Sequence, residues 1–307
     1  MTTHRLLAGV DVGGTKILAG LADGEGRVLA TASAPTPQTT AEEVAARIAA
    51  LVQEVCANAD APAALGVAVP AVTDAAQRRV LWAPNLVGWQ QETSVAETLE
   101  GLLGLPTSLH YDGHAWVTGE WWCGAARGAD EVVLLAVGTG IGGGVISGGR
   151  LHRGRVGVAG AVGWWAMGWS EPEEGGAPPR LEDLASGPAL AEAAGARNAV
   201  AAFAAARRGE MRAVLAVESA ARALGIAVAN LVSLLDPEVV VLAGGVITGG
   251  ADLLLPPIES IVRAEAQPQV AAQVRLVPAA CGEDGGWLGA AWLANRSWGH
   301  DASCPSE

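Results

Sequence analysis

The chain has 307 residues, of which half are hydrophobic and 17% are charged, so it is long enough for about two folded domains and too apolar for a disordered protein. Its formal net charge of −13 excludes general attraction to nucleic acid, polyphosphate and anionic membranes, because no basic patch offsets it. The scattered cysteines, the lack of a signal-peptide pattern and the lack of an apolar run of about 20 residues lead us to expect a soluble cytoplasmic protein without disulfides.

The chain contains an internal repeat. Residues 6–32, LLAGVDVGGTKILAGLADGEGRVLATA, predict a strand, a glycine turn, a second strand, a tight turn at Asp23–Gly26 and a third strand. Residues 132–154, VVLLAVGTGIGGGVISGGRLHRG, repeat this order with a turn at Gly148–Gly149. Two such meanders, each followed by helices, predict an α/β protein with two similar domains that face a cleft. The expected domains are an N-terminal one over residues 1–112, joined by the C-terminal helix 286–296, and a C-terminal one over residues 113–285.

Other elements are predicted by periodicity and by helix breakers. They are a helix over 41–57, a buried strand over 63–74, a long apolar helix over 214–237, a strand over 238–245 and a final helix over 285–295. Thr40 is a residue type that caps helix N-termini, and Asp236–Pro237 ends the long helix. The Gly-, Pro- and Glu-rich residues 168–180 predict an irregular loop.

Three glycine turns follow predicted strands. In DVGGTK (11–16), glycines let backbone N–H groups approach phosphate, Thr and Lys add donors and charge, and Asp11 would lie near Mg²⁺ through water; the simpler alternative is an ordinary β-turn. GTGIGGG (138–144) is denser in glycine, and LAGG (242–245) suits an adenosine against the backbone. Neither a P-loop nor a Rossmann fingerprint occurs. The expected nucleotide-binding residues are Asp11, Gly13, Gly14, Thr15, Lys16, Gly138, Thr139, Gly140, Gly244 and Gly245.

These motifs, in this order, resemble those of the ROK family (repressors, open reading frames and sugar kinases) of the actin-like ATPase superfamily. The other matching pieces are APNLVGW (83–89), YDGHAWVTGEWWCGAARG (111–128), ASG (185–187), LLDPEVVVLAGG (234–245) and GWLGAAWLA (286–294). The resemblance implies two actin-like (ribonuclease H-like) domains with a cleft between them. It also implies transfer of the γ-phosphoryl group of ATP, with Mg²⁺, to a sugar hydroxyl, usually the one at C6. Asp112 would be the base that accepts the hydroxyl proton; a lone Asp after a strand is otherwise a helix N-cap.

The sequence departs from the family pattern around the sugar. The family's Asn-Asp-Ala-Asn is here Tyr111-Asp112-Gly113-His114, and its Gly-Glu-x-Gly-His is Gly160-Ala161-Val162-Gly163-Trp164. The cysteine cluster that completes the family's zinc site is replaced by EPEEGGAPPR. Because tetrahedral zinc needs four N or S ligands, we expect no structural zinc.

The expected substrate contacts are Asn85, Tyr111, His114, Ala161, Trp164 and Glu182. Three of them have a plainer alternative. Asn85 could be a turn residue, and His114 could cap or pack. Trp164 or Trp165 could lie against an apolar ring face, or fill the space that zinc leaves. Trp116, Trp121 and Trp122 recur at helical spacing and suit a core or a subunit contact. An apolar wall discriminates weakly between hydroxyls, which argues against strict glucose specificity.

We therefore predict an ATP-dependent kinase for the primary hydroxyl of a hexose or hexose-like polyol, acting as a homodimer without nucleic-acid or membrane partners. Two alternatives stay open: a kinase for an amino sugar or a C7-cyclitol of a specialised pathway, and a sugar-binding protein that has lost catalysis. A sugar-responsive repressor is disfavoured, because the first glycine turn begins at Asp11 and leaves no room for a DNA-binding domain before it.

Overall fold

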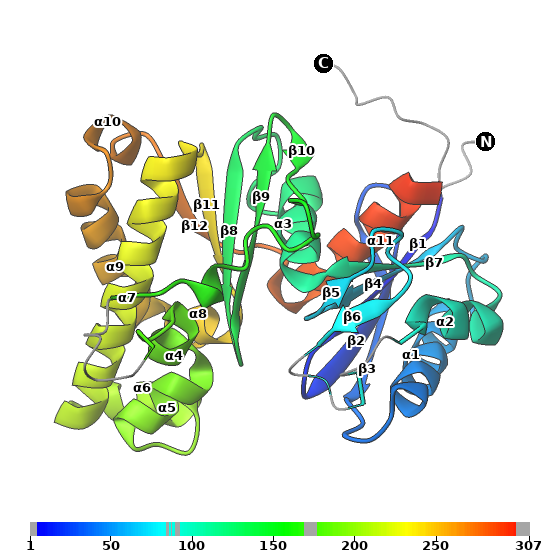
Figure 1. The fold of residues 1–307 in the computed structure, drawn as a ribbon, viewed down its shortest axis with the longest axis horizontal. Coiled ribbons are helices and arrows are strands. Elements are labelled where there is room, and N and C mark those ends of the chain that lie inside the picture. Colours follow the sequence, from blue (N-terminus) through cyan, green and yellow to red (C-terminus); the bar gives the residue numbers. More distant parts are fainter. Residues whose placement is uncertain (1–4, 84–85, 87, 90–92, 169–176, 299–307) are drawn as a thin grey trace. The chain divides into compact units, whose positions relative to one another are not determined.

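The structure, a computed structural model, describes residues 5–298 except 84–85, 87, 90–92 and 169–176 (Figure 1). It divides into two compact units. Unit 1 comprises Met1–Gly128, Leu151–Ala159 and Glu283–Glu307, and unit 2 comprises Ala129–Arg150 and Gly160–Gly282.

Unit 1 contains a five-stranded mixed sheet in the order β3-β2-β1-β4-β7. The first three strands form the predicted antiparallel meander, and β4 and β7 run parallel to β1. The strands are β1 (Leu7–Val12), β2 (Lys16–Ala22), β3 (Val28–Pro35), β4 (Leu65–Val69) and β7 (Thr107–Tyr111). A separate two-stranded sheet pairs β5 (Val72–Thr73) with β6 (Val80–Trp82).

Helices cover both faces of this sheet. On one face, Val10 and Val67 join a buried core with α1 (Ala41–Cys56) and α2 (Val95–Leu103). The predicted cap of α1 is present, since the Thr40 hydroxyl accepts the N–H of Glu43 at 3.3 Å. The other face packs against α11 (Gly285–Trp298), which in turn packs along α3 (Asp112–Cys123).

A row of glycines lets α11 approach the sheet. Gly20, Gly9 and Gly66 are neighbours across β2, β1 and β4. A β-carbon on Gly9 would lie 2.0 Å from the carbonyl oxygen of Trp287, and one on Gly66 would lie 1.9 Å from that of Ala290. The sheet therefore has no room for side chains along this row; the backbone of α11 fills the space at Gly9 and Gly66, and the Trp287 ring fills it at Gly20.

Glycines also bring α3 and α11 into close contact. A β-carbon on Gly119 would lie 2.2 Å from the carbonyl oxygen of Gly285, and one on Gly289 would lie 1.8 Å from that of Ala115. Because α3 packs on α11 in this way, the structure keeps α3 in unit 1 and divides the chain after Gly128, whereas we expected the division after Asp112.

Unit 2 repeats the strand order of unit 1, with a sheet β10-β9-β8-β11-β12. The repeat predicted from the sequence is thus confirmed at the level of topology. The strands are β8 (Val132–Val137), β9 (Ile141–Ser147), β10 (Arg150–Leu151), β11 (Val239–Ala243) and β12 (Arg275–Pro278). The helices are α4 (Leu181–Ala185), α5 (Gly187–Ala194), α6 (Ala199–Arg207), α7 (Met211–Leu235), α8 (Gly245–Gly249), α9 (Ala251–Glu265) and α10 (Pro268–Ala271).

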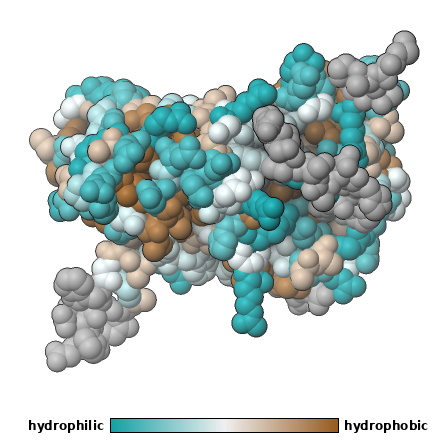
Figure 2. All heavy atoms as spheres, turned by 90° about the horizontal axis from the view of Figure 1, so that it is seen from above, coloured by the Kyte–Doolittle hydropathy of each residue, from teal (hydrophilic) through white to brown (hydrophobic). Residues whose placement is uncertain are grey.

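Helix α7 is the central helix of unit 2. It ends where predicted, with Asp236 in the left-handed conformation at φ 46° before Pro237. By length and composition alone it could span a membrane, but 61% of its most apolar window is buried in the core of the protein. Its exposed face still carries apolar side chains, among them Met211, Leu215 and Leu234. Figure 2 likewise shows hydrophobic residues among hydrophilic ones on the face that it displays.

Candidate active site

The topology of unit 1 places two predicted carboxylates at one edge of the sheet. Asp11 lies near the carboxyl end of β1, and Asp112 follows the carboxyl end of β7. Both strands pair in parallel with β4, so their carboxyl ends meet at the same edge. Ligands of parallel α/β sheets bind at such edges, because the loops that leave the strands gather there.

The first glycine turn joins β1 to β2 beside Asp11. The N–H of Gly13 donates to the carbonyl of Lys16 at 2.9 Å, which closes the turn. Thr36 and Gln38, which follow β3, donate from their side chains to the carbonyls of Gly13 and Gly14 at 2.7 and 2.8 Å. The turn is therefore held by its own hydrogen bond and by the two residues that follow β3.

Charged groups next to this turn have defined partners. The Lys16 ammonium lies 2.7 Å from the Glu283 carboxylate, in an ion pair that is exposed on both sides. Burial raises the pKa of Asp11 to about 6, although a hydrogen bond from Trp116 and the charge of Lys16 act in the opposite direction. Asp11 is thus a desolvated carboxyl group, for which a bound cation would be a favourable neighbour.

Asp112 is the first residue of α3, and its Oδ1 accepts the N–H of Gly113 at 2.7 Å. Tyr111 before it packs edge-on against the His114 ring, with 5.1 Å between the ring centroids. His114 Nε2 donates to the carbonyl of Ala159 at 3.0 Å. Desolvation lowers the pKa of His114 to about 4, so the ring is neutral at physiological pH and carries its proton on Nε2. His114 therefore ties the Asp112 helix to the segment 151–159.

The second glycine turn, in unit 2, is held by the segment LEDLASG. The N–H of Ile141 donates to Glu182 Oε2 at 2.7 Å, and the N–H of Gly187 donates to the carbonyl of Gly138 at 2.8 Å. A β-carbon on Gly140 would lie 2.6 Å from the same Glu182 oxygen. Glu182, which we expected to contact substrate, is therefore placed against the Gly138–Ile141 turn, where the exposed Thr139 forms the tip.

The third glycine turn lies beside the second. Gly244 follows β11, which is parallel to β8, and adopts a φ of 92° that favours glycine. A β-carbon there would lie 2.3 Å from the carbonyl oxygen of Val137, the last residue before Gly138. The turns at Gly138–Gly140 and Gly244–Gly245 thus form one glycine-lined edge of unit 2.

The segment GVAGAVGWWAM (157–167) makes packing contacts within the protein. β-Carbons on Gly160 and Gly163 would lie 2.6 and 2.2 Å from backbone oxygens of β9, so these glycines let the segment, with Ala161 between them, lie on that strand. Trp165 packs against the core of unit 2. Trp164 is 49% exposed, and the Arg180 guanidinium lies over its ring at 4.0 Å from the centroid.

Backbone contacts join the two ends of the loop that follows. Ala166 forms a β-bridge with Arg180, the N–H of Met167 donates to the carbonyl of Pro179, and the N–H of Leu181 donates to that of Trp165. The loop at 168–180 is thus closed at its base by backbone pairing and by the Trp164–Arg180 stack. Residues 169–176 lie outside the described part of the chain, as does Asn85.

Several site residues escaped the sequence reasoning. The helical spacing of Trp116 suits a core or a subunit contact, and the structure shows that it also donates to Asp11. Gly286, Gly187 and Arg180 were not considered individually. In the sequence, Gly286 is marked only by its place in GWLGAAWLA and Gly187 only by its place in ASG. Arg180 is marked only by its position at the end of the loop 168–180.

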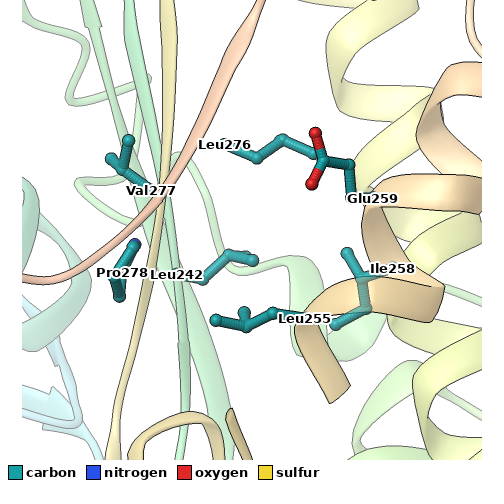
Figure 3. Close-up of a pocket in the computed structure, with 7 residues that line it drawn as sticks. All are labelled: Leu242, Leu255, Ile258, Glu259, Leu276, Val277 and Pro278. Carbon is teal, nitrogen blue, oxygen red and sulfur yellow. The ribbon is translucent and has the colours of Figure 1, made fainter. Parts of the chain in front are cut away.

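A separate pocket in unit 2 lies between α9 and strands β11 and β12 (Figure 3). Apolar side chains and one carboxylate, Glu259, line it, and none of the predicted site residues does. Its lining has no cationic side chain that would suit a phosphate. Over the described ranges, no group of three or more His, Cys, Asp or Glu side chains is arranged to hold a metal ion.

Comparisons with known proteins give matches over most of the chain. The model of the ROK family matches residues 7–297. A glucokinase of Streptomyces coelicolor is 34% identical over 279 residues, which cover 82% of this chain and 86% of the relative. An N-acetylmannosamine kinase of Escherichia fergusonii is 32% identical over 291 residues, 93% of this chain and 97% of the relative. The crystal structure of a ROK family glucokinase from Streptomyces griseus in complex with glucose and AMPPNP matches with a TM-score of 0.82 and 34% identity, covering 95% of this chain and 99% of that one.

Proposed function

Because the chain belongs to the ROK family, with its two-domain actin-like fold, we propose that it is an ATP-dependent sugar kinase that phosphorylates the primary hydroxyl of a hexose, as a glucokinase does. One observation carries the proposal. Asp112 stands at the same sheet edge as Asp11 and the first glycine turn, in a chain 34% identical to a glucokinase.

Asp112 is the proposed catalytic base. Its carboxylate begins α3 and accepts the Gly113 N–H, which fixes the orientation of the group. A sugar hydroxyl placed beside it would lose its proton to the carboxylate as its oxygen attacks the γ-phosphorus of ATP, and the bond from that phosphorus to the leaving ADP would break. The neutral His114 ring does not compete for that proton at physiological pH, and its bond to Ala159 holds α3 in place.

The residues present fit Mg²⁺ and a nucleotide. ATP and Mg²⁺ supply the phosphoryl group and neutralise its charge when bound. Asp11 offers a carboxylate oxygen, and only a glycine at position 286 leaves room beside it, since a β-carbon there would lie 2.3 Å from Asp11 Oδ2. Unit 1 would contribute Asp11, Gly13, Gly14, Thr15 and Lys16, and unit 2 would contribute Gly138, Thr139, Gly140, Gly244 and Gly245.

The sugar site stays a proposal with three substrate classes: a hexose, an amino sugar and a C7-cyclitol. The proposed contacts remain Asn85, Tyr111, His114, Ala161 and Trp164. For Glu182, the bond from Ile141 supports a role in the glycine turn instead. The 49% exposed Trp164, stacked under Arg180, supports a site with an indole where the family pattern has a histidine, and with no need for structural zinc. Because one relative is an N-acetylmannosamine kinase, an amino sugar is the second candidate substrate. The Trp164 indole could also lie against the ring of a C7-cyclitol, which is the third candidate.

We also propose a homodimer in the cytoplasm, without nucleic-acid or membrane partners. The exposed apolar side chains of α7, Met211, Leu215 and Leu234, support a subunit contact. The net charge of −13 opposes binding to nucleic acid and to anionic membranes.

The test is ADP formation by the purified protein with ATP and Mg²⁺ across glucose, N-acetylmannosamine and a C7-cyclitol, with the phosphorylated position read by NMR. We expect turnover on a hexose with the phosphate at the primary carbon. Turnover confined to the cyclitol would move the protein to the specialised kinase class. Binding of ATP and sugar without turnover on any acceptor would instead identify a sugar-binding protein that has lost catalysis.

A further inference from the structure

Three elements of unit 1 meet at Asp11. They are β1, which carries Asp11, the start of α11 at Gly286 and the second turn of α3 at Trp116. A β-carbon on Gly286 would lie 2.3 Å from Asp11 Oδ2 and 2.9 Å from Trp116 Nε1. The carboxylate and the indole nitrogen therefore both pack against the α-carbon of one glycine.

Trp116 donates its indole N–H to the Asp11 carboxylate. An indole is a donor only, so it fixes a carboxylate without adding a ligand or a charge that would compete for a cation. Trp116 also follows Asp112 by four residues on α3, and side chains at this spacing lie on the same face of a helix. One helix thus carries the proposed base and the donor that holds the second carboxylate.

We propose that Trp116 is a positioning residue that holds the Asp11 carboxylate in the orientation that receives the Mg²⁺ of a bound nucleotide. The inference rests on the proposed kinase function. A hydrogen bond to a charged group is among the stronger ones in proteins, and the carboxylate it holds is desolvated, so its orientation is set before a cation arrives. Without the indole N–H, Asp11 would lose this constraint while α3 and Asp112 stayed in place.

The test uses nucleotide affinity, which does not depend on turnover. The dissociation constant of ADP is measured by calorimetry on the full chain, with Mg²⁺ and with EDTA, for the wild type, Trp116→Phe and the control Trp121→Phe. Trp121 lies on the same helix and packs edge-on against Trp292 at 5.4 Å between ring centroids. We expect Mg²⁺ to tighten ADP binding in the wild type and the control. In Trp116→Phe this tightening should fall about tenfold, with the affinity in EDTA unchanged.

A second variant guards against a folding defect. Gly286→Ala places a methyl between Asp11 and Trp116 and should reduce the Mg²⁺ effect in the same way, with circular dichroism as the check on folding. If either folded variant keeps the wild-type ratio of the two ADP affinities, or if Mg²⁺ has no effect on the wild type, the proposal is overturned. Loss of the Mg²⁺ effect in a protein that phosphorylates no sugar would support this inference and contradict only the kinase assignment.

Discussion

Glu182 illustrates how one residue's place decides its role. Its Oε2 accepts the Ile141 N–H at 2.7 Å and fills the space beside Gly140 that a side chain would need. A carboxylate used in this way holds the Gly138–Ile141 turn in shape. Because we propose that this turn binds the nucleotide, loss of the Glu182 carboxylate should affect ATP more than sugar.

We predict that Glu182→Ala raises the KM for ATP about tenfold, because the turn loses a charge-assisted hydrogen bond, and leaves the KM for sugar close to the wild-type value. Glu182→Gln keeps an acceptor oxygen and should have a smaller effect. Steady-state kinetics with each substrate varied in turn provides the measurement. A rise in the sugar KM alone would mean that the carboxylate contacts the substrate instead.

At the residue scale, the sequence predicts groups that act alone better than groups that act through a partner. The glycine turns were visible because runs of glycine after strands have few other uses. The contact between Trp116 and Asp11 was not visible, since it depends on how α3 and α11 cross, and the residues that meet there are far apart in the chain. Trp164 was recognised as unusual, but its stacking on Arg180 needed the loop ends to be paired.

At the scale of elements, the packing of α11 on the first sheet depends on glycine. We predict that Gly66→Ala lowers the free energy of unfolding by at least about 1–3 kcal/mol, because its β-carbon would lie 1.9 Å from the Ala290 carbonyl oxygen and the backbone must move. Urea unfolding measures the change.

Gly101→Ala is the matched control. Gly101 lies in α2 with no neighbouring atom within 4 Å of an added β-carbon. There the substitution should raise the free energy of unfolding by about 0.5–1 kcal/mol, since alanine restricts the unfolded chain and favours the helix. Equal effects of the two substitutions would contradict the close approach of α11 to β4.

The link between α3 and the segment 151–159 makes stability depend on pH. Desolvation by burial lowers the folded-state pKa of His114 from 6.5 to about 4, with the charges of Arg153 and His152 adding to the effect and the Ala159 carbonyl opposing it. The unfolded chain therefore takes up a proton below pH 6.5 that the folded protein does not. The contribution is present in full above pH 6.5 and is lost as the pH falls toward 4.

We predict that the free energy of unfolding of the wild type falls between pH 7 and pH 4 by roughly 3 kcal/mol more than that of His114→Gln. Gln keeps an N–H donor for Ala159 and does not titrate, and the burial that is the main cause of the lowered pKa of His110 is present in both proteins. Parallel pH profiles for the two proteins would show that His114 is not buried as a neutral ring.

Element order was predicted well because the repeat has a strong pattern. Both meanders, α1 with its Thr40 cap, and the end of α7 at Asp236 lie where periodicity and breakers indicated. The division of the chain differs from the expected one because glycine contacts between α3 and α11 keep α3 with the first sheet. Such contacts leave no periodic signal, since glycine has no side chain to repeat.

At the scale of the whole molecule, the two units share one strand order. In each unit the proposed site residues lie at the carboxyl ends of parallel strands: β1 and β7 in one unit, β8 and β11 in the other. The matched family model spans residues 7–297 and so includes both sets. A kinase needs both, because positioning of the nucleotide and removal of the hydroxyl proton are separate tasks.

The most direct measurement compares the wild type with Asp112→Asn on the best hexose, with kcat measured alongside the dissociation constant of ATP. Asparagine keeps the size of the side chain and an oxygen for the Gly113 N–H, but it cannot accept the proton. We predict that kcat falls by at least about 100-fold while ATP affinity stays within about twofold of the wild type. A variant that keeps more than about a tenth of wild-type turnover would contradict the assignment of Asp112 as the base.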